Sequence, residues 1–237
     1  MKSKIENRKS KIRVALTQSE GKLEGLEQAL HKRGFEVVRS PLIKTETILA
    51  DEVRARAKKL LDCPWLLFTS PSGVEAWGAL KLPFDQSHIG TVGQKTAAAV
   101  EQLGGEMSLI GEPQNAAGLA EAFLQSSSAA SPVGLPRGDR ALPTLQDELE
   151  AGGFETRPVV VYRTLQLGWT AGEVNIVVLS SPSAVEALPQ RVGKTAKLIA
   201  LGPSTGAAIS EYGWSYVQAE SPAVEAILMA LEGLERV

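Results

Sequence analysis

Two hydrophobic patterns alternate along the chain. Short runs in which every residue is aliphatic or aromatic, such as Trp65–Phe68 and Ile176–Leu179, are typical of strands covered on both faces. Between such runs, apolar residues recur at three- and four-residue spacing, as at Leu23, Leu26 and Leu30, which predicts helices packed on one side. The predicted strands are Ile12–Leu16, Phe35–Val38, Trp65–Phe68, Ile89–Val92, Val133–Pro136, Thr156–Tyr162, Ile176–Leu179 and Leu198–Leu201. The predicted helices are Leu23–Leu30, Ser72–Leu80, Lys95–Leu103, Thr144–Ala151, Ser183–Leu188, Thr205–Tyr212 and Ala223–Leu234.

The pattern repeats within the chain. Ser70–Ala76 reads Ser-Pro-Ser-Gly-Val-Glu-Ala, and Ser181–Ala187 reads Ser-Pro-Ser-Ala-Val-Glu-Ala. Gly93–Ala99 matches Gly202–Ala208 in the same order. Because short apolar strands between amphipathic helices form parallel sheets with helices on both faces, we expect an α/β fold with two doubly wound domains that arose by internal duplication.

Composition and charge narrow the classes of function. Of the 237 residues, 25 are Lys or Arg and 27 are Asp or Glu, so the net charge of -2 provides no basic field for nucleic acid or an anionic membrane. One cysteine, Cys63, and two histidines, His31 and His88, exclude an intrachain disulfide and argue against a metal site. No apolar run reaches the roughly 20 residues of a membrane-spanning helix. We expect a cytoplasmic protein whose residues 1–11 form a disordered tail.

The candidate binding residues follow the predicted strands, because parallel α/β sheets bind ligands at the carboxyl ends of their strands. Hydroxyl-rich turns that enter helices offer free N–H groups and suit a carboxylate or phosphate. The candidates are Thr69, Ser70, Ser72, Lys95, Thr96, Arg137, Ser181, Ser183, Gly202, Ser204 and Thr205.

Plain structural roles fit the same residues. Ser72 and Ser183 fit ordinary N-caps, Gly93 and Gly202 fit tight turns, and Arg137 fits a solvated surface side chain. Neither a Walker loop nor a GxGxxG motif occurs, so nucleotide binding is unsupported.

Tyr162 ends the apolar run Pro158–Tyr162. A tyrosine in this position either belongs to the core with its hydroxyl satisfied, or presents that hydroxyl to a cleft. The spacing is compatible with both.

In their order and spacing, these motifs resemble the uroporphyrinogen-III synthase family from Ile12 to Leu234. The segments that carry the resemblance are Thr69–Ser72, Pro136–Asp139, Val161–Thr164, Ser180–Ser183, Ile199–Thr205 and Glu220–Pro222. The resemblance implies a discontinuous domain of residues 12–38 plus 167–237 and a second domain of residues 45–157. Linker strands 39–44 and 158–166 would join them, with a cleft between the domains. A tandem division into 12–125 and 132–237 fits the repeat equally well.

The resemblance also implies a reaction without metal or organic cofactor. The linear tetrapyrrole hydroxymethylbilane loses its terminal hydroxyl as water and closes with inversion of ring D to give uroporphyrinogen III. Tyr162 matches the family's cleft tyrosine, which would donate a proton to the departing hydroxyl. Ser181 and Thr205 match hydroxyl positions lining the cleft.

On the other domain, Thr69, Ser70 and Thr96 would face these hydroxyls. Many family members carry arginine where this chain has Gln18, which puts a carboxylate contact there in doubt.

Expectations about partners follow from the same resemblance. We expect a monomer that binds the small-molecule substrate, with a transient contact to the enzyme that forms the bilane. The alternative is a two-lobed module that binds a small anion without catalysis, because two α/β lobes joined by two crossings also describe ligand-binding proteins.

Overall fold

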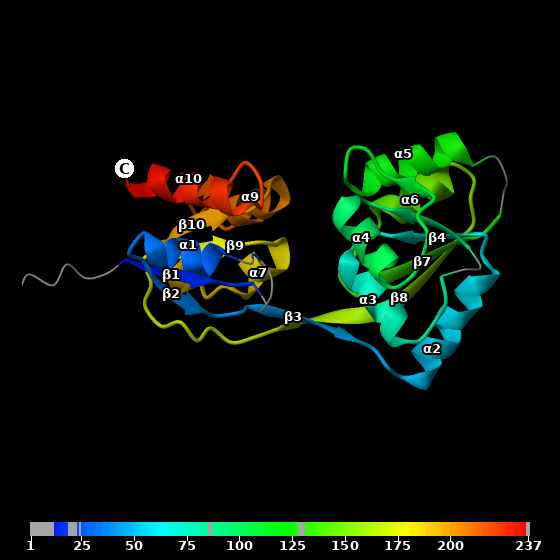
Figure 1. The fold of residues 1–237 in the computed structure, drawn as a ribbon, viewed down its shortest axis with the longest axis horizontal. Helices are drawn as coiled ribbons and strands as arrows, with labels where there is room; N and C mark the ends of the chain where they lie inside the picture. The colour runs from blue at the N-terminus through cyan, green and yellow to red at the C-terminus, as the bar shows by residue number, and fades with distance from the viewer. Residues whose placement is uncertain (1–11, 19–22, 24, 85–86, 128–130, 236–237) are drawn as a thin grey trace, which may run out of the picture. The chain divides into compact units, whose positions relative to one another are not determined.

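A computed structural model describes residues 12–18, 23, 25–84, 87–127 and 131–235. The expected disordered tail, residues 1–11, lies outside the described residues. Tertiary contacts divide the chain into two compact units (Figure 1). Unit 1 comprises Met1–Lys44 and Leu165–Val237, and unit 2 comprises Thr45–Thr164.

Unit 1 contains a parallel sheet with the strand order β11-β10-β9-β1-β2. The first strand pairs with a strand from the last third of the chain, with Val14 opposite Ile176. This pairing differs from the tandem division. The strands are β1 (Arg13–Leu16), β2 (Glu36–Arg39), β9 (Ile176–Leu179), β10 (Lys197–Ala200) and β11 (Tyr216–Gln218).

Helices cover both faces of this sheet, which explains why its central strand β9 is apolar at every position. Val14 and Ile199 face a core completed by α1 and α10, whereas Ala15 and Leu198 face a core completed by α7 and α9. Since successive strand residues alternate between faces, all four residues of β9 and the last three of β1 and of β10 are buried, whereas the edge strands β2 and β11 contain no buried residue. The helices of this unit are α1 (Leu26–Lys32), α7 (Pro182–Ala187), α8 (Gln190–Thr195), α9 (Pro203–Glu211) and α10 (Val224–Glu235).

Unit 2 contains a sheet with the order β3-β8-β7-β4-β5-β6, in which β8 to β6 are parallel. Its strands are β3 (Ile43–Thr47), β4 (Trp65–Phe68), β5 (His88–Thr91), β6 (Leu109–Ile110), β7 (Val133–Gly138) and β8 (Thr156–Gln166). Its helical segments are α2 (Asp51–Lys58), η1 (Lys59–Asp62), α3 (Pro71–Ala79), α4 (Gln94–Gln102), α5 (Ala116–Ser126) and α6 (Thr144–Ala151).

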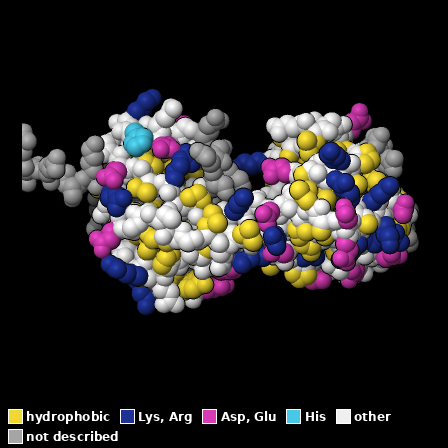
Figure 2. Space-filling model, turned by 90° about the horizontal axis from the view of Figure 1, so that it is seen from below, with side chains coloured by type: hydrophobic (Ala, Val, Ile, Leu, Met, Phe, Trp, Pro, Cys, Tyr) yellow, Lys and Arg dark blue, Asp and Glu magenta, His cyan; other side chains and the backbone are white. Residues whose placement is uncertain are grey.

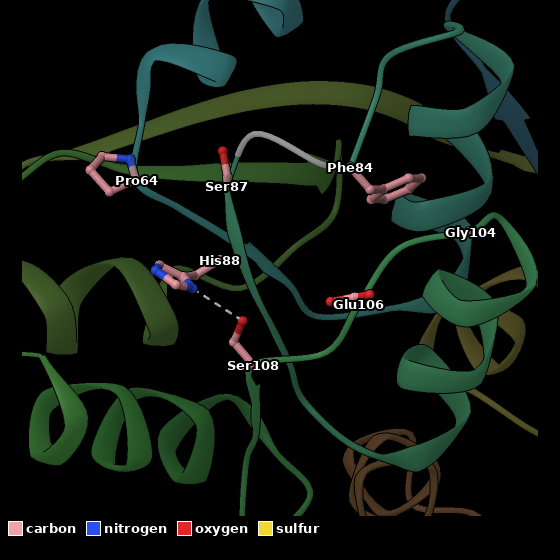
Figure 3. Close-up of a pocket in the computed structure, with 7 residues that line it drawn as sticks. All are labelled: Pro64, Phe84, Ser87, His88, Gly104, Glu106 and Ser108. Atoms are coloured by element: carbon pink, nitrogen blue, oxygen red, sulfur yellow. Dashed lines mark hydrogen bonds between the residues drawn. The ribbon is translucent and has the colours of Figure 1, made fainter.

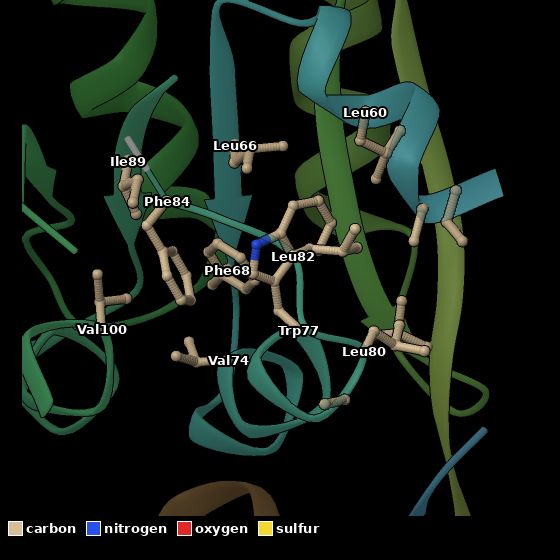
Figure 4. Packing of buried hydrophobic residues seen from close by; sticks show 14 of the residues in the cluster. Leu60, Leu66, Phe68, Val74, Trp77, Leu80, Leu82, Phe84, Ile89 and Val100 are labelled. Carbon is tan, nitrogen blue, oxygen red and sulfur yellow. The ribbon is translucent and has the colours of Figure 1, made fainter. Parts of the chain in front are cut away.

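The core of unit 2 also lies on two sides of its sheet. On one side Trp77 of α3 packs edge-on against Phe68 of β4, with ring centroids 6.1 Å apart, and donates its indole N–H to Pro83 O at 2.9 Å (Figure 4). On the other side Phe123 of α5 packs against Leu135 of β7 within a second cluster. Both units thus conform to the predicted α/β class with parallel sheets.

Some elements differ from their predicted bounds. The leucine stripe predicts a helix from Leu23, but α1 begins at Leu26, because Leu23 and Gly25 have φ values of 59° and 85° that a right-handed helix excludes. The predicted linker 158–166 lies within β8, which is continuous over Thr156–Gln166, whereas the predicted linker 39–44 runs from the end of β2 to the start of β3 (Ile43–Thr47), with residues 40–42 in neither strand. Among the helices of the described residues, none combines the length and apolar character that a bilayer span requires.

Candidate active site

The strand order of each unit reverses at one point, and open α/β sheets bind their ligands at the carboxyl ends of the strands beside such a point. In unit 1 the reversal lies between β1 and β9. In unit 2 the chain runs from β7 outward to β8 on one side, whereas β4, β5 and β6 follow one another on the other side, so the corresponding reversal lies between β7 and β4. The turns after β4 and β9 carry Ser70 and Ser181, so the predicted hydroxyl-rich turns occupy both reversal points.

Ser70 and Ser181 cap their helices with matching geometry. Their backbones have φ, ψ of -158°, 152° and -158°, 155°, and each Oγ accepts a hydrogen bond of 3.2 Å from an N–H, that of Gly73 or Ala184. In each helix a proline occupies the first turn, where its missing N–H costs nothing. The interpretation of Ser72 and Ser183 as N-caps is therefore wrong, since both lie inside the first turn and are half-buried.

Tyr162 reaches the Ser70 turn from β8. Its Oη lies 2.9 Å from Ser70 Oγ, within hydrogen-bonding distance, and the ring packs partly against the unit 2 core. The β7–β8 register shifts between Arg137 and Gly138, so that Gly138 lies opposite Tyr162. Such irregularities re-aim side chains near functional sites. Tyr162 thus combines core packing with a hydroxyl at the carboxyl edge of the sheet.

The Pro136–Asp139 motif supports the tyrosine segment from β7. Asp139 N–H donates to Tyr162 O at 3.1 Å, and Asp139 Oδ1 accepts from Thr164 N–H at 2.9 Å. Sequence reasoning assigned no individual role to Gly138 or Asp139. The sequence contained one hint, the occurrence of Pro136–Asp139 together with Val161–Thr164. The contacts between the two segments depend on the register of β7 against β8, which the spacing of the motifs does not specify.

Arg137 is held within unit 2. Its guanidinium donates to Gln146 Oε1 at 3.1 Å, to Leu142 O at 3.3 Å and to Ala141 O. The side chain is half-buried rather than solvated, so the surface interpretation is wrong. A carboxylate at this guanidinium would compete with the Ala141–Leu142 turn.

The second pair of predicted turns begins α4 and α9. Gly93 and Gly202 have φ of 172° and 176°, which is extended backbone open to any residue, so a special glycine turn is not required. The Gln114 side chain packs on Gly93, where a Cβ would lie 2.4 Å from Gln114 Oε1, so a larger residue there would require this side chain to move. At Gly202 such an atom would meet nothing within 4 Å.

The side chains of these two turns divide into exposed and buried ones. Lys95 and Ser204 are exposed, whereas the side chains of Thr96 and Thr205 are each only 2% exposed. A ligand at these turns meets Lys95, Ser204 and backbone groups before it meets either threonine hydroxyl.

Comparison with known proteins identifies the family of the chain. The family model described as uroporphyrinogen-III synthase HemD matches residues 24–229. The chain belongs to the uroporphyrinogen-III synthase family. A putative uroporphyrinogen-III synthase of Methanothermobacter thermautotrophicus is 25% identical over 218 residues, covering 81% of this chain and 86% of the relative.

Two solved structures of uroporphyrinogen-III synthases share the fold. A mutant enzyme of Thermus thermophilus has a TM-score of 0.67 at 21% identity, covering 95% of this chain and 100% of the other. The enzyme of Helicobacter pylori has a TM-score of 0.67 at 15% identity, covering 94% and 99%.

At the unit 1 reversal point, this member of the uroporphyrinogen-III synthase family has two buried polar side chains whose packing the sequence pattern did not predict. Thr17 Oγ1 donates to Val178 O at 2.7 Å, and Gln18 Nε2 donates to the same oxygen at 3.4 Å. Gln18 is only 5% exposed. The Gln18 amide therefore links the segment after β1 to β9. An arginine at this position would instead carry a positive charge.

A surface hollow of about 550 Å³ lies at the opposite, amino-terminal edge of the unit 2 sheet (Figure 3). Within it His88 Nδ1 lies 3.4 Å from Ser108 Oγ, and the imidazole lies against the Trp65 ring with the centroids 4.9 Å apart and the ring planes tilted by 36°. None of the predicted site residues lines it.

On the face seen in Figure 2, Lys and Arg side chains are interspersed with Asp and Glu, and they form no broad basic patch that would bind anions. Within the described part of the chain, no cluster of three or more His, Cys, Asp or Glu is placed to hold a metal. Local N–H groups, hydroxyls and single cations are thus the groups available to a carboxylate.

Proposed function

We propose that this chain cyclises hydroxymethylbilane to uroporphyrinogen III, with loss of water and inversion of ring D, as a step of tetrapyrrole biosynthesis. Family membership supports the reaction. The observation that carries the site is the hydroxyl of Tyr162, which Ser70 meets at 2.9 Å beside the reversal point of unit 2.

Tyr162 is the proposed proton donor. As the C–O bond of the terminal hydroxymethyl group breaks, the phenol proton passes to the departing hydroxide and water leaves. The electron pair of the ring A pyrrole nitrogen then completes a cationic azafulvene. Ring D attacks this carbon through its already substituted position, and the spiro intermediate opens and recloses with ring D inverted. The proton that the closing pyrrole finally releases returns to the phenolate, so no oxidant, reductant or cofactor is consumed.

Helix N-termini are the proposed carboxylate sites. The first turns of α3, α4 and α9 present backbone N–H groups and the positive ends of helix dipoles at the carboxyl edges of the sheets. Lys95 and Ser204 are exposed beside them. The proposed substrate-binding residues remain Thr69, Ser70, Ser72, Lys95, Thr96, Arg137, Ser181, Ser183, Gly202, Ser204 and Thr205, with Thr96 and Thr205 acting through their backbones.

We also propose that the two units descend from one duplicated α/β domain. Counted from β1 in unit 1 and from β7 in unit 2, and leaving out the edge strand β3, both sheets have the order 2-1-3-4-5, and the matching caps at Ser70 and Ser181 support the same origin. The proposed domains are 12–38 plus 167–237 and 45–157, joined by 39–44 and 158–166.

A product assay tests the function. The purified chain is incubated with hydroxymethylbilane in the presence of a chelator, and the oxidised products are separated by chromatography. We expect the type III isomer. Formation of the type I isomer alone, at the uncatalysed rate, would overturn the proposal, and saturable binding of the bilane without turnover would favour the anion-binding module.

A further inference from the structure

The structure assigns Ser70 a positioning role: we infer that its hydroxyl orients Tyr162 and donates to the phenolate when the phenol proton leaves. This inference rests on the proposed function of Tyr162 and deepens it. It also changes the expectation for Ser70, from a substrate contact to a residue that acts through another.

The backbone fixes Ser70 Oγ in place. Ser70 is the N-cap of α3, and the following Pro71 restricts the turn. Its Oγ accepts from Gly73 N–H at 3.2 Å. This N–H belongs to the first turn of the helix, where the dipole polarises the groups bound to it. A hydroxyl held in this way has one acceptor position occupied and one proton to give.

The proton count then determines the direction of donation. Either oxygen of the Ser70–Tyr162 pair can donate in the neutral state. A phenolate, in contrast, only accepts hydrogen bonds, so once Tyr162 has given up its proton the Ser70 O–H must supply the bond. If Ser70 already donates in the resting state, the phenol proton is free to point toward the leaving hydroxyl.

Comparison with Ser181 separates this role from capping. Ser181 has the same backbone geometry and the same 3.2 Å bond from an N–H. In the part of the chain that the structure describes, its Oγ meets no tyrosine hydroxyl. Capping of the helix therefore does not require a contact with a tyrosine, and the contact between Ser70 and Tyr162 is a feature additional to the cap.

A kinetic double-mutant cycle tests the inference, with substitutions Ser70→Ala and Tyr162→Phe. We expect Ser70→Ala to lower kcat about tenfold, the effect of one hydrogen bond, and to leave KM within about twofold. In the Tyr162→Phe background the same substitution should cause no further loss of kcat, because its effect passes through the phenol. Ser70→Thr, which keeps the hydroxyl, should retain most of the rate.

Asn115→Ala provides the matched control for lost capping. Asn115 caps α5 in the same unit, with Oδ1 2.8 Å from Gly118 N–H, and is not among the proposed site residues. We expect it to lower the melting temperature as Ser70→Ala does, with kcat unchanged.

Three outcomes would overturn the inference. An equal loss of kcat from Ser70→Ala in both backgrounds would show that Ser70 acts independently of Tyr162, and a rise in KM alone would identify a substrate contact. Full activity of Tyr162→Phe would refute the proton-donor assignment and this role of Ser70 with it, whereas type III product from the unmodified chain would still support the proposed reaction.

Discussion

The ring of Tyr162 occupies the space in which a side chain at Gly138 would lie. A Cβ at that position would fall 2.5 Å from Tyr162 Cζ and 2.7 Å from its Oη, well inside an ordinary van der Waals contact. The glycine of the Pro136–Asp139 motif therefore provides the space in which the phenol approaches Ser70.

Substitution of this glycine should impair the reaction more than the fold. In Gly138→Ala the ring must move by about 1 Å, and a displacement of that size commonly costs about 10²-fold in rate. We expect kcat to fall by about 10- to 100-fold. Gly134→Ala is the matched control on the same strand, where the added methyl would meet Leu66 at 2.7 Å but not Tyr162. Steady-state kinetics should show that Gly134→Ala keeps its kcat, although overpacking lowers its free energy of unfolding by roughly 1–3 kcal/mol. Equal kcat losses in the two variants would argue against the steric explanation.

Removal of the Tyr162 hydroxyl should separate catalysis from stability. In Tyr162→Phe the ring still packs against the core, so we expect the free energy of unfolding to change by no more than about 1 kcal/mol. The rate should fall by about 10²-fold, since general-acid assistance contributes roughly 10²–10⁴-fold. Tyr216→Phe, on β11 of unit 1, serves as the control with unchanged turnover. A large drop in melting temperature with full specific activity would instead identify Tyr162 as a core residue only.

Phe123 should be among the most costly side chains of unit 2 to truncate. It is 1% exposed and makes edge contacts with Trp65 and Phe154, at centroid distances of 5.3 and 5.0 Å. We expect Phe123→Ala to lower the free energy of unfolding by about 3–5 kcal/mol, as measured by denaturant titration. Leu49→Ala, at a position that is 63% exposed, should change it by less than about 0.5 kcal/mol. Similar losses in both variants would contradict the packing described for α5.

Cys63 should make stability depend on alkaline pH. Burial raises the pKa of its thiol, and the nearby Arg157 opposes only part of that effect. A raised pKa in the folded state stabilises the fold below the ordinary thiol pKa of about 8.5, and this contribution is lost as the pH rises through the folded-state pKa. Urea midpoints measured at pH 7 and pH 10 should therefore fall further for the unmodified chain than for Cys63→Ala. Identical falls would show that the thiol does not contribute.

The sequence predicts best those elements whose environment is uniform. Strands β4 and β9 are apolar at every position because helices cover both faces of their sheets, and their bounds match the prediction. Helix α2 was not predicted because among its residues only Ala57 is buried, which leaves no periodic stripe. Helix α5 did carry a signal, the cap Asn115 followed by Leu119 and Phe123 at four-residue spacing, and its omission reflects the polar segment around it.

The candidate site was predictable in place but not in detail. Strand ends and small hydroxyls identify the turns at Ser70 and Ser181, since the carboxyl edge of a parallel sheet follows from topology. The contact between Tyr162 and Ser70 depends on the register shift opposite Gly138, which only three-dimensional pairing determines. Likewise the burial of Thr205 depends on helix packing that its position after a glycine does not reveal.

The pairing of β1 with β9 has a consequence for how the protein is made. During synthesis on the ribosome β1 emerges first, yet its neighbour β9 follows only after all of unit 2 has been translated. Because long loops must close before such a pair forms, the contiguous unit 2 can complete its own sheet while the exposed edge of β1 still waits for its partner. Shielding that edge is then a task for the nascent chain or a chaperone, and a ribosome that stalls before residue 176 leaves it unprotected.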